Sequence, residues 1–495
     1  MKKLLLALLG FVALLVAMLA VVLVANTARA TRGAAPMSVA PVLVRVDSAG
    51  AIARLATAVT FQTISYEEGT QAADSAAFRA LHEHLRTSFH LVHAALARET
   101  VAGLSLLYTW PGTDSTLAPV VLMGHLDVVP VIPGTERQWT QPPFGGVIAD
   151  GYVWGRGTLD DKVSVMAVLE AAEGALRGGV RPRRTIYFAF GHDEEVGGGG
   201  ARALKETLVK RGIKGPALVV DEGGVIVPGA MLGTNGTVAL VGASEKGFLS
   251  LQLSVKGAGG HSSAPPAHSA IGQLASAITR LEASPFPLVL DGPTKAMMER
   301  LRGGMPYARR LALSNLWLFG PVVSRAFADK PTGAAMLRTT TAVTIVKGGV
   351  KTNVLPIDAT ATVNFRIRPG ETIASVTERV RDVIADTGVL IEAVGFKTEP
   401  SAVSDPAGPG FTTLERSLRE VYPEPDLVVA PYLVIGGTDA RIWSDLSTQT
   451  FRFLAAPVTA DALARIHGTN ERVAVGGYLL AIRFFERLIR NTDGL

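Results

Sequence analysis

Residues 120–127 read VVLMGHLD, an apolar run that passes directly into a histidine and an aspartate. A similar β-branched and aromatic run occupies residues 185–188, and helical patterns with apolar residues at three- and four-residue steps cover residues 161–177 and 201–211. Short strands that alternate with helices are typical of an α/β fold with a mainly parallel sheet. We therefore expect residues 120–127 to end at the C-terminal edge of such a sheet, where α/β proteins bind their ligands.

The pattern of apolar residues changes at Gly247. Residues 248–255 alternate between apolar and polar side chains, residues 270–281 have a helical pattern, and residues 339–347 and 358–366 alternate again. This mixture predicts an α+β module inserted into the first domain. The expected organisation is a signal anchor or signal peptide at 1–30, a catalytic domain in two parts at 49–246 and 368–495, and a lid or dimerisation domain at 247–367.

The N-terminus carries a targeting signal. Lys2 and Lys3 precede an unbroken apolar stretch over residues 4–25, which is long enough to span a bilayer and favours a transmembrane anchor. The small-x-small pattern Ala28-Arg29-Ala30 also suits a signal peptidase, so a cleaved signal stays open. The positive flank places the catalytic part outside the cytoplasm, periplasmic or extracellular, or secreted if the chain is cleaved after Ala30.

The composition narrows the chemistry that is available. The 495 residues, 48% of them hydrophobic, can bury a large core and exceed the usual size of one domain. The absence of cysteine excludes disulfides, thiolate metal ligands and a cysteine nucleophile, so any metal must bind to His, Asp and Glu. The net charge of +5 comes from scattered Lys and Arg, and we expect no nucleic acid partner.

Acids and histidines follow several of the apolar runs. His125 and Asp127 project to the same side, as expected for a metal ligand and the carboxylate that orients its ring. The glycine-rich turn at 155–162 ends in Asp160 and Asp161, of which one can cap the following helix while the other binds a cation. Asp160 in particular could bridge two cations.

Carboxylates are crowded after the next strands. Residues 193–195 are three consecutive acids, and removing them from water costs several kcal/mol each unless a cation pairs them. One Glu would bind a metal and its neighbour would act as the general base for a metal-activated water. The apolar residues 218–220 are followed by Asp221 and Glu222 and then by two glycines. Residues 467–471 read HGTNE. With only nitrogen and oxygen ligands, zinc is the expected metal, with manganese or cobalt as alternatives.

The order of these motifs resembles the dinuclear-zinc aminoacylase and carboxypeptidase metallopeptidase superfamily, from about residue 50 to the C-terminus. Within it, the chain is most similar to the subgroup of carboxypeptidase S, a Gly-Xaa carboxypeptidase, and the secreted N-fatty-acyl amino acid synthase/hydrolase. The stretches that carry the likeness to this subgroup are residues 315–319 (NLWLF), 339–341 (TTT), 348–356 (GGVKTNVLP) and 467–471.

The resemblance implies a ligand set of two zinc ions per subunit. His125, Asp160 and either Asp221 or Glu222 would hold one ion. Asp160, Glu195 and His467 would hold the other. Glu194 would be the general base and Asp127 would orient His125. Superfamily members place the ligand at either of two neighbouring positions, so Asp221 and Glu222 both remain candidates.

The resemblance also implies a ferredoxin-like lid that dimerises. His261, in the segment GGHSS, would stabilise the oxyanion, acting on a partner subunit or after lid closure. Asn353 would contact the substrate, and Arg366 and Arg441 would bind its carboxylate through their planar guanidinium groups. Residues 315–319 have two interpretations, a lid decoration or dimer contact on one side and an acyl-chain or membrane contact on the other.

The sequence therefore predicts a zinc-dependent amidohydrolase or peptidase that cleaves the amide bond of N-acyl amino acids or small peptides with a free C-terminal carboxylate. A Gly-Xaa-type carboxypeptidase or dipeptidase, rather than an N-acyl amino acid amidase, is the alternative within the same chemistry. An inactive scaffold or binding protein on the same fold is the alternative from another class.

Overall fold

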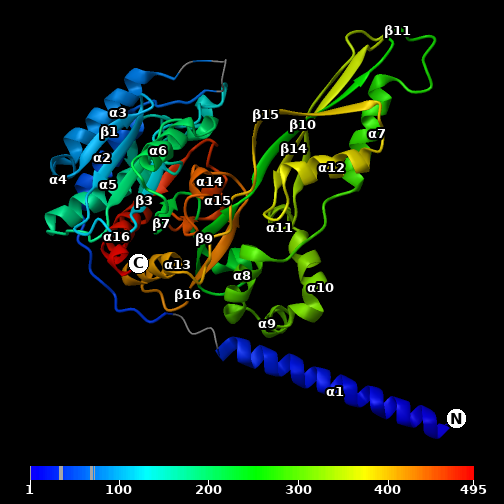
Figure 1. Ribbon diagram of the computed structural model, residues 1–495, viewed down its shortest axis with the longest axis horizontal. Helices are drawn as coiled ribbons and strands as arrows, with labels where there is room; N and C mark the ends of the chain where they lie inside the picture. Colours follow the sequence, from blue (N-terminus) through cyan, green and yellow to red (C-terminus); the bar gives the residue numbers. More distant parts are fainter. Residues whose placement is uncertain (1, 33–36, 67–70, 72) are drawn as a thin grey trace.

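The computed structural model describes residues 2–32, 37–66, 71 and 73–495. Figure 1 shows a body of helices around a sheet, an arm that projects from it, and a long N-terminal helix at its base. The α-helices are α1 Lys2–Arg32, α2 Ser48–Thr60, α3 Ser75–Ser88, α4 His90–Ala95, α5 Lys162–Arg177, α6 Gly199–Lys210, α7 Ala270–Ala283, α8 Gly292–Leu301, α9 Tyr307–Ser314, α10 Leu316–Ala328, α11 Pro331–Leu337, α12 Ile373–Ile384, α13 Pro409–Val421, α14 Ala440–Trp443, α15 Ala460–Leu463 and α16 Val475–Asn491.

The strands are β1 Ala97–Val101, β2 Ser105–Trp110, β3 Val120–His125, β4 Val147–Ala149, β5 Tyr152–Trp154, β6 Ile186–Gly191, β7 Leu218–Asp221, β8 Ile226–Pro228, β9 Thr237–Glu245, β10 Gly247–Lys256, β11 Gly260–His261, β12 Thr340–Gly348, β13 Val354–Leu355, β14 Asp358–Ile367, β15 Val389–Thr398, β16 Leu427–Val434, β17 Thr450–Arg452 and β18 Arg472–Ala474. Short 3-10 turns lie at η1 Glu136–Gln138, η2 Glu194–Val196, η3 Gly229–Leu232, η4 Arg302–Gly304 and η5 Thr492–Gly494.

The body is built on one sheet of nine strands, in the order β1-β2-β6-β3-β7-β17-β9-β16, with β8 paired to β9. Strands β6, β3, β7 and β17 run parallel in its centre, and β9 pairs with β16 in parallel as well. The antiparallel pairs of β1, β2 and β6 lie toward one edge. The expected α/β fold with a mainly parallel sheet is confirmed.

Both faces of this sheet are covered by helices. Every residue of β3 and β6 is buried, as expected for parallel strands between two helical layers. Leu122 packs into the core that includes α5, α13 and α16, while its neighbour Met123 packs against α6 and Trp443 on the opposite face. The predicted helices at 161–177 and 201–211 correspond to α5 and α6.

A small sheet of three strands, in the order β18-β5-β4, joins two parts of the chain that are far apart in sequence. Arg472 pairs with Trp154, and Ala474 pairs with Tyr152. This pairing holds the segment just before β18 beside the glycine-rich turn that follows β5.

The arm contains a second, fully antiparallel sheet in the order β12-β14-β10-β15. Helices α7 and α12 pack on it and share a separate apolar core with its strands. The predicted lid domain ended at residue 367, but α12 and β15 belong to this sheet and core. The domain division therefore stays a prediction, and the strand pairing favours a boundary after Thr398.

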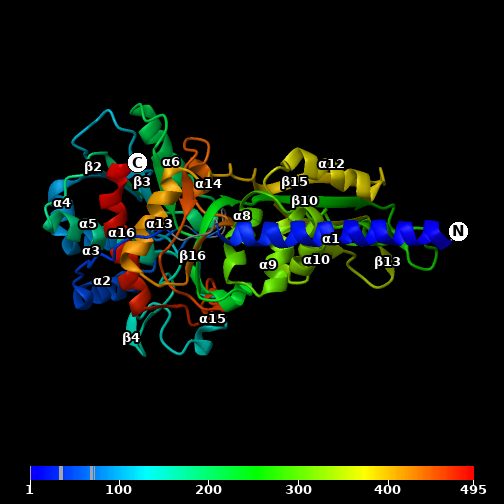
Figure 2. The ribbon, with the colours of Figure 1, turned by 90° about the horizontal axis from the view of Figure 1, so that it is seen from below.

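Helices α8 to α11 follow α7 in the chain and lead to β12 of the arm. Helix α9 contacts α1, the only described helix long and apolar enough by itself to cross a membrane. Seen from below, α1 passes α8, α9 and α10 and then extends away from the body (Figure 2).

A buried ion pair joins two neighbouring strands of the body's sheet, β9 and β17. Glu245, the last residue of β9, pairs with Arg452 of β17, and both side chains are fully buried. Glu245 also accepts hydrogen bonds from the backbone N–H and the hydroxyl of Thr438, at 2.9 and 2.7 Å. The pair thus holds the loop that leads into α14.

We expect Glu245→Gln to lower the free energy of unfolding by about 3–5 kcal/mol, because it leaves the Arg452 charge buried without a counter-charge. Urea unfolding of the full chain in detergent measures this loss. The double variant Glu245→Gln/Arg452→Met removes both charges and should recover most of the stability. A loss below about 1 kcal/mol in the single variant would contradict the argument.

Candidate active site

Three neighbouring parallel strands bring acids and a histidine to one edge of the sheet. Strand β3 ends at His125 and lies between β6 and β7. Strand β6 is followed by the acidic turn η2, and β7 ends at Asp221. The carboxyl ends of parallel strands meet at the same edge, so their terminal side chains converge there.

His125 lies within reach of two carboxylates. Its Nε2 is 2.9 Å from Oδ1 of Asp160 and 3.7 Å from Oε1 of Glu222. His125 is 1% exposed. One nitrogen and two carboxylate oxygens that converge in this way form a group suited to a metal ion.

Asp160 also belongs to a second group of the same kind. Its other oxygen, Oδ2, is 2.8 Å from Nε2 of His467, and that nitrogen is 3.2 Å from Oε2 of Glu195. The pairing of β18 with β5 brings His467 to this position. His467 has a φ of +62°, a left-handed conformation that is uncommon for histidine and is found at functional sites. Asp160 is thus shared by two ligand groups.

Asp127 holds the other side of this arrangement. Its carboxylate is 3.2 Å from Nδ1 of His125 and is completely buried. It accepts a 2.7 Å hydrogen bond from the hydroxyl of Ser65, and bonds of 3.2 Å from the backbone N–H groups of Glu194 and Glu195. Asp127 therefore fixes both the histidine ring and the turn that carries the two glutamates.

The neighbours Asp221 and Glu222 have different surroundings. Glu222 belongs to the group of His125 and Asp160, whereas Asp221 does not. Oδ2 of Asp221 accepts a 2.7 Å hydrogen bond from the backbone N–H of Ala440, at the start of α14. The structure thus brings Glu222 to the cluster and directs Asp221 to the helix.

The crowding of carboxylates raises the energy of their charged forms. Burial raises the pKa of Glu222 well above its ordinary value, and Asp160 and Asp161 add to the effect. Burial also raises the pKa of Glu195, whose Oε1 finds no hydrogen-bond partner among the described residues. A buried carboxylate without a partner is the residue type that a cation stabilises, so the donor set fits a metal.

Glu194 lies beside the cluster and not in either ligand group. Its Oε1 accepts a 3.2 Å hydrogen bond from the guanidinium of Arg441. Burial, and next the charge of Asp439, raise the pKa of the Glu194 carboxyl well above its ordinary value. A carboxyl with a raised pKa can take up a proton from water and pass it on.

Arg441, the partner of Glu194, belongs to a group of two arginines and two aromatic rings. The guanidinium of Arg441 is 5.5 Å from the ring of Phe396, and that of Arg366 is 4.7 Å from the ring of Phe248. The two rings are 5.9 Å apart. Burial, and then the charge of Arg441, lower the pKa of Arg366. Two guanidinium groups beside an apolar surface suit a substrate with a carboxylate and an apolar group.

The structure does not bring His261 and Asn353 to the cluster. His261 is exposed on β11, at the tip of the arm (Figure 1). The backbone carbonyl of Asn353 accepts a hydrogen bond from Ser262 at the same tip. Within one chain, neither residue lies beside the ligand groups.

Several supporting residues were absent from the sequence-based site. Glu471 is fully buried, pairs with Arg156 at 2.5 Å and accepts hydrogen bonds from the backbone N–H groups of Leu159 and Asp160. Glu471 is the last residue of the HGTNE stretch, four residues after His467. This position could have indicated that it supports the site. Ser65 follows no recognisable pattern, so nothing in the sequence distinguished it.

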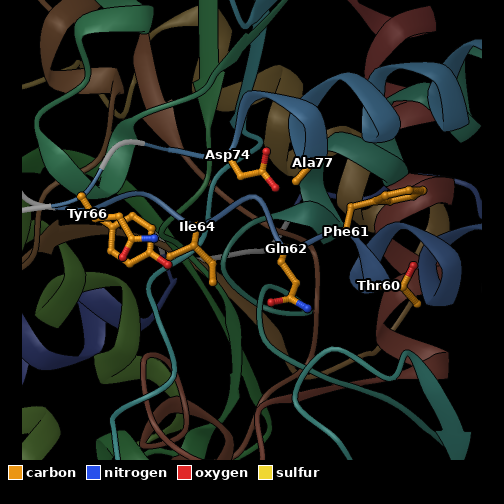
Figure 3. Close-up of a pocket in the computed structure, with 8 residues that line it drawn as sticks. Thr60, Phe61, Gln62, Ile64, Tyr66, Asp74 and Ala77 are labelled. Atoms are coloured by element: carbon orange, nitrogen blue, oxygen red, sulfur yellow. The ribbon is translucent and has the colours of Figure 1, made fainter.

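A separate hollow of about 450 Å³ lies at the end of α2. Phe61, Ile64 and Asp74 are among its lining residues (Figure 3). None of the residues in the two ligand groups lines it. The cluster, and not this hollow, is therefore the candidate active site.

An α/β sheet whose strand ends present two nitrogen–oxygen ligand groups with a shared carboxylate, beside a buried glutamate, defines a metal-dependent hydrolase. The model of the peptidase family M20/M25/M40 matches residues 121–491. The chain belongs to this family.

Relatives and solved structures agree with this assignment. A probable carboxypeptidase S-like 2 of Dictyostelium discoideum is 41% identical over 443 residues, which are 89% of this chain and 84% of the relative. A human N-fatty-acyl-amino acid synthase/hydrolase is 41% identical over 400 residues, 80% of this chain and 79% of the relative. A M20 family metallo-carboxypeptidase from Sulfolobus solfataricus has the same fold, with a TM-score of 0.66 at 19% identity over 90% of this chain and 99% of that one. The predicted resemblance is confirmed.

Proposed function

We propose that the cluster holds two zinc ions. His125, Asp160 and Glu222 would hold one, and Asp160, Glu195 and His467 the other. This assignment is supported by the two groups of converging ligand atoms and by the unpartnered oxygen of Glu195. Zinc suits ligands that are all nitrogen and oxygen, and when bound it would supply a water of lowered pKa and polarise the substrate carbonyl.

Glu194 is the proposed general base and acid. Its carboxyl would take the proton of the attacking water and pass it to the amine that leaves. Asp127 is a positioning residue, because it holds the ring of His125 and the backbone of Glu194 in place. This division of labour leaves Glu194 free of the ligand groups, as its role requires.

Arg441 and Arg366 are proposed to bind the carboxylate of the substrate. In the substrate-free structure Arg441 donates to Glu194 at 3.2 Å. A substrate carboxylate would compete for this guanidinium and release Glu194 to act on water. Recognition of the carboxylate and availability of the base would then be coupled.

The arm is proposed to be a lid that also dimerises. In the conformation of the structure, His261 and Asn353 at its tip are remote from the cluster of their own chain, so they would act on a partner subunit or after the lid closes. An exposed histidine on a projecting sheet has the reach for this role.

Helix α1 is proposed to be retained as a membrane anchor, with the catalytic body outside the cytoplasm. Asn315, which is completely buried, has α1 as its partner. Its side-chain amide donates to the carbonyl of Leu23 at 3.2 Å, and its Oδ1 accepts from Asn26 at 3.0 Å. Cleavage after Ala30 would leave this amide with fewer partners, which favours the anchor over the cleaved signal.

The proposed reaction is hydrolysis of the amide bond of N-acyl amino acids or small peptides with a free carboxylate. The single observation that carries it is the pairing of Glu194, the neighbour of the ligand-group residue Glu195, with Arg441. The names of the relatives support both an N-acyl amino acid hydrolase and a carboxypeptidase.

A substrate panel tests the proposal. The full chain in detergent with zinc is given N-acetyl, N-oleoyl and glycyl amino acids, each as free acid and as methyl ester. We expect the ester to lower kcat/KM by at least about 30-fold, because removing one partner of a buried charge pair costs about 2 kcal/mol or more.

The preferred acyl group then selects between the two alternatives. Faster release from N-oleoyl substrates would assign an N-acyl amino acid amidase, and faster release from glycyl substrates a carboxypeptidase. Equal turnover of acids and esters would contradict the role of Arg441 and Arg366. Turnover of none of these substrates would contradict the proposed reaction.

A further inference from the structure

Helices α9 and α10 form an elbow against the end of α1. The two helices meet at an angle of 120° around Asn315. The side-chain amide of Asn315 bonds to Leu23 and Asn26 of α1, at the point where the apolar stretch 4–25 ends. The elbow therefore lies at the level where α1 would leave a bilayer.

Helix α10 exposes large apolar side chains to its surroundings. It reads LWLFGPVVSRAFA, and the structure describes all of these residues. Among them only Ser324 is buried. Trp317 is 62% exposed and Val322 is 63% exposed, and Leu318 lies between them on the same side of the helix. A helix that points its apolar side chains outward is typical of one that lies against lipid.

The charges around the elbow have one sign. Residues 302–330 contain five basic residues, Arg302, Arg309, Arg310, Arg325 and Lys330, against the single acid Asp329. Arg309, Arg325 and Lys330 are exposed. Basic side chains beside exposed Trp and Leu are the combination that binds the headgroup region of an anionic bilayer.

The alternative cover for this surface is a second copy of the chain. Helix α10 begins just after Asn315, whose side chain bonds to α1, and α1 lies beside α9 and extends away from the body (Figures 1 and 2). A bilayer that surrounds α1 would begin beside the start of α10, so lipid is the occupant that the anchored chain would bring to this face. The positive charges would repel a second copy of the same surface.

We propose that the outward face of α10, formed by Trp317, Leu318 and Val322, docks in the surface of the bilayer that α1 spans. The elbow would lie in the interface plane, where tryptophan is enriched. The bilayer contact would be made at two points, α1 and α10, and would fix the orientation of the catalytic body on the membrane. This inference rests on the proposed anchoring by α1.

The tryptophans of this chain provide a direct test. The chain has five, and four of them, Trp110, Trp139, Trp154 and Trp443, are at most 9% exposed. Trp317 is the only exposed one, and all five are described. The full chain is reconstituted in vesicles of phosphatidylcholine and phosphatidylglycerol, with or without brominated acyl chains, beside the matched variant Trp317→Phe.

We expect brominated lipid to quench more than about half of the emission that Trp317 contributes, since an interfacial ring lies close to the upper acyl chains. Brominated lipid should leave the emission of the Trp317→Phe variant unchanged. Aqueous iodide should quench the two proteins equally. In Val322→Glu, a charge on the docking face should weaken the lipid quenching at least twofold and expose Trp317 to iodide.

Other outcomes would overturn the inference. Quenching of Trp317 by iodide and not by brominated lipid would place the face in water. Protection from both quenchers would mean that protein covers it, as in contact with a second copy. Flotation of the vesicles separates the two proposals. If the chain fails to float, the anchor fails and the docking with it, whereas a floating chain with Trp317 unquenched by lipid overturns the docking alone.

Discussion

Glu194→Gln is expected to lower kcat for amide hydrolysis by roughly 10²–10⁴-fold, the usual contribution of one general acid–base group. Glutamine keeps the size of the side chain and can still accept the hydrogen bond from Arg441, which is 3.2 Å long in the structure. It cannot take up a proton from water. Because Glu194 belongs to neither ligand group, the zinc content should be unchanged. Initial rates at saturating substrate and metal analysis of the same sample measure both effects.

The matched control is Glu206→Gln, the same substitution on the exposed side of α6. It should leave kcat and the zinc content unchanged. Retention of more than a tenth of the activity in Glu194→Gln would exclude Glu194 as the base. Loss of zinc together with activity would instead assign Glu194 to metal binding.

The central sheet could be predicted from the sequence because its strands are buried on both faces. Strands β3 and β6 read as continuous apolar runs, and such runs are easily recognised when helical patterns separate them. For the same reason the sequence predicts candidate site residues at the strand ends, His125 and Glu194 among them, whose roles stay predictions. In an α/β sheet the carboxyl ends of the parallel strands lie at the edge where ligands bind.

The sheet against which helix α12 packs could not be predicted in this way. Helix α12, residues 373–384, has a clear amphipathic pattern. The pattern shows that one face is buried and does not show against which sheet. Its partner, the core around β10 and β14, is chosen by contacts between distant parts of the chain.

The choice between Asp221 and Glu222 depends on a single residue of register. Neighbouring side chains at a strand end point in opposite directions, so a shift of one residue exchanges them. In the structure the backbone N–H of Ala440 fixes Asp221. That contact comes from α14, more than two hundred positions later, and no local pattern announces it.

Asp160→Asn is expected to remove both zinc ions, because Asp160 is the one residue that the two ligand groups share. Its Oδ1 faces His125 at 2.9 Å and its Oδ2 faces His467 at 2.8 Å, and asparagine replaces one of these oxygens with a nitrogen that donates. Activity should fall at least ~10²-fold, since bound metal contributes several kcal/mol to transition-state stabilisation. Glu222→Gln should lose one ion and Asp221→Asn neither, as measured by metal analysis after dialysis.

Thermal unfolding of the metal-free proteins distinguishes lost ligation from simple damage to the fold. Asp160, Glu195 and Glu222 are close together, and without a cation their charges repel. Against the effect of burial and this repulsion, hydrogen bonds with His125 and His467 hold the pKa of Asp160 below its ordinary value, so Asp160→Asn should lower the Tm of the metal-free form. Added zinc should raise the Tm of the wild type and leave that of Asp160→Asn unchanged, because only a protein that binds the ion is stabilised by it. A rise in the Tm of both proteins would exclude Asp160 as the shared ligand. In the metal analysis, loss of an ion in Asp221→Asn but not in Glu222→Gln would reverse the assignment of those two acids.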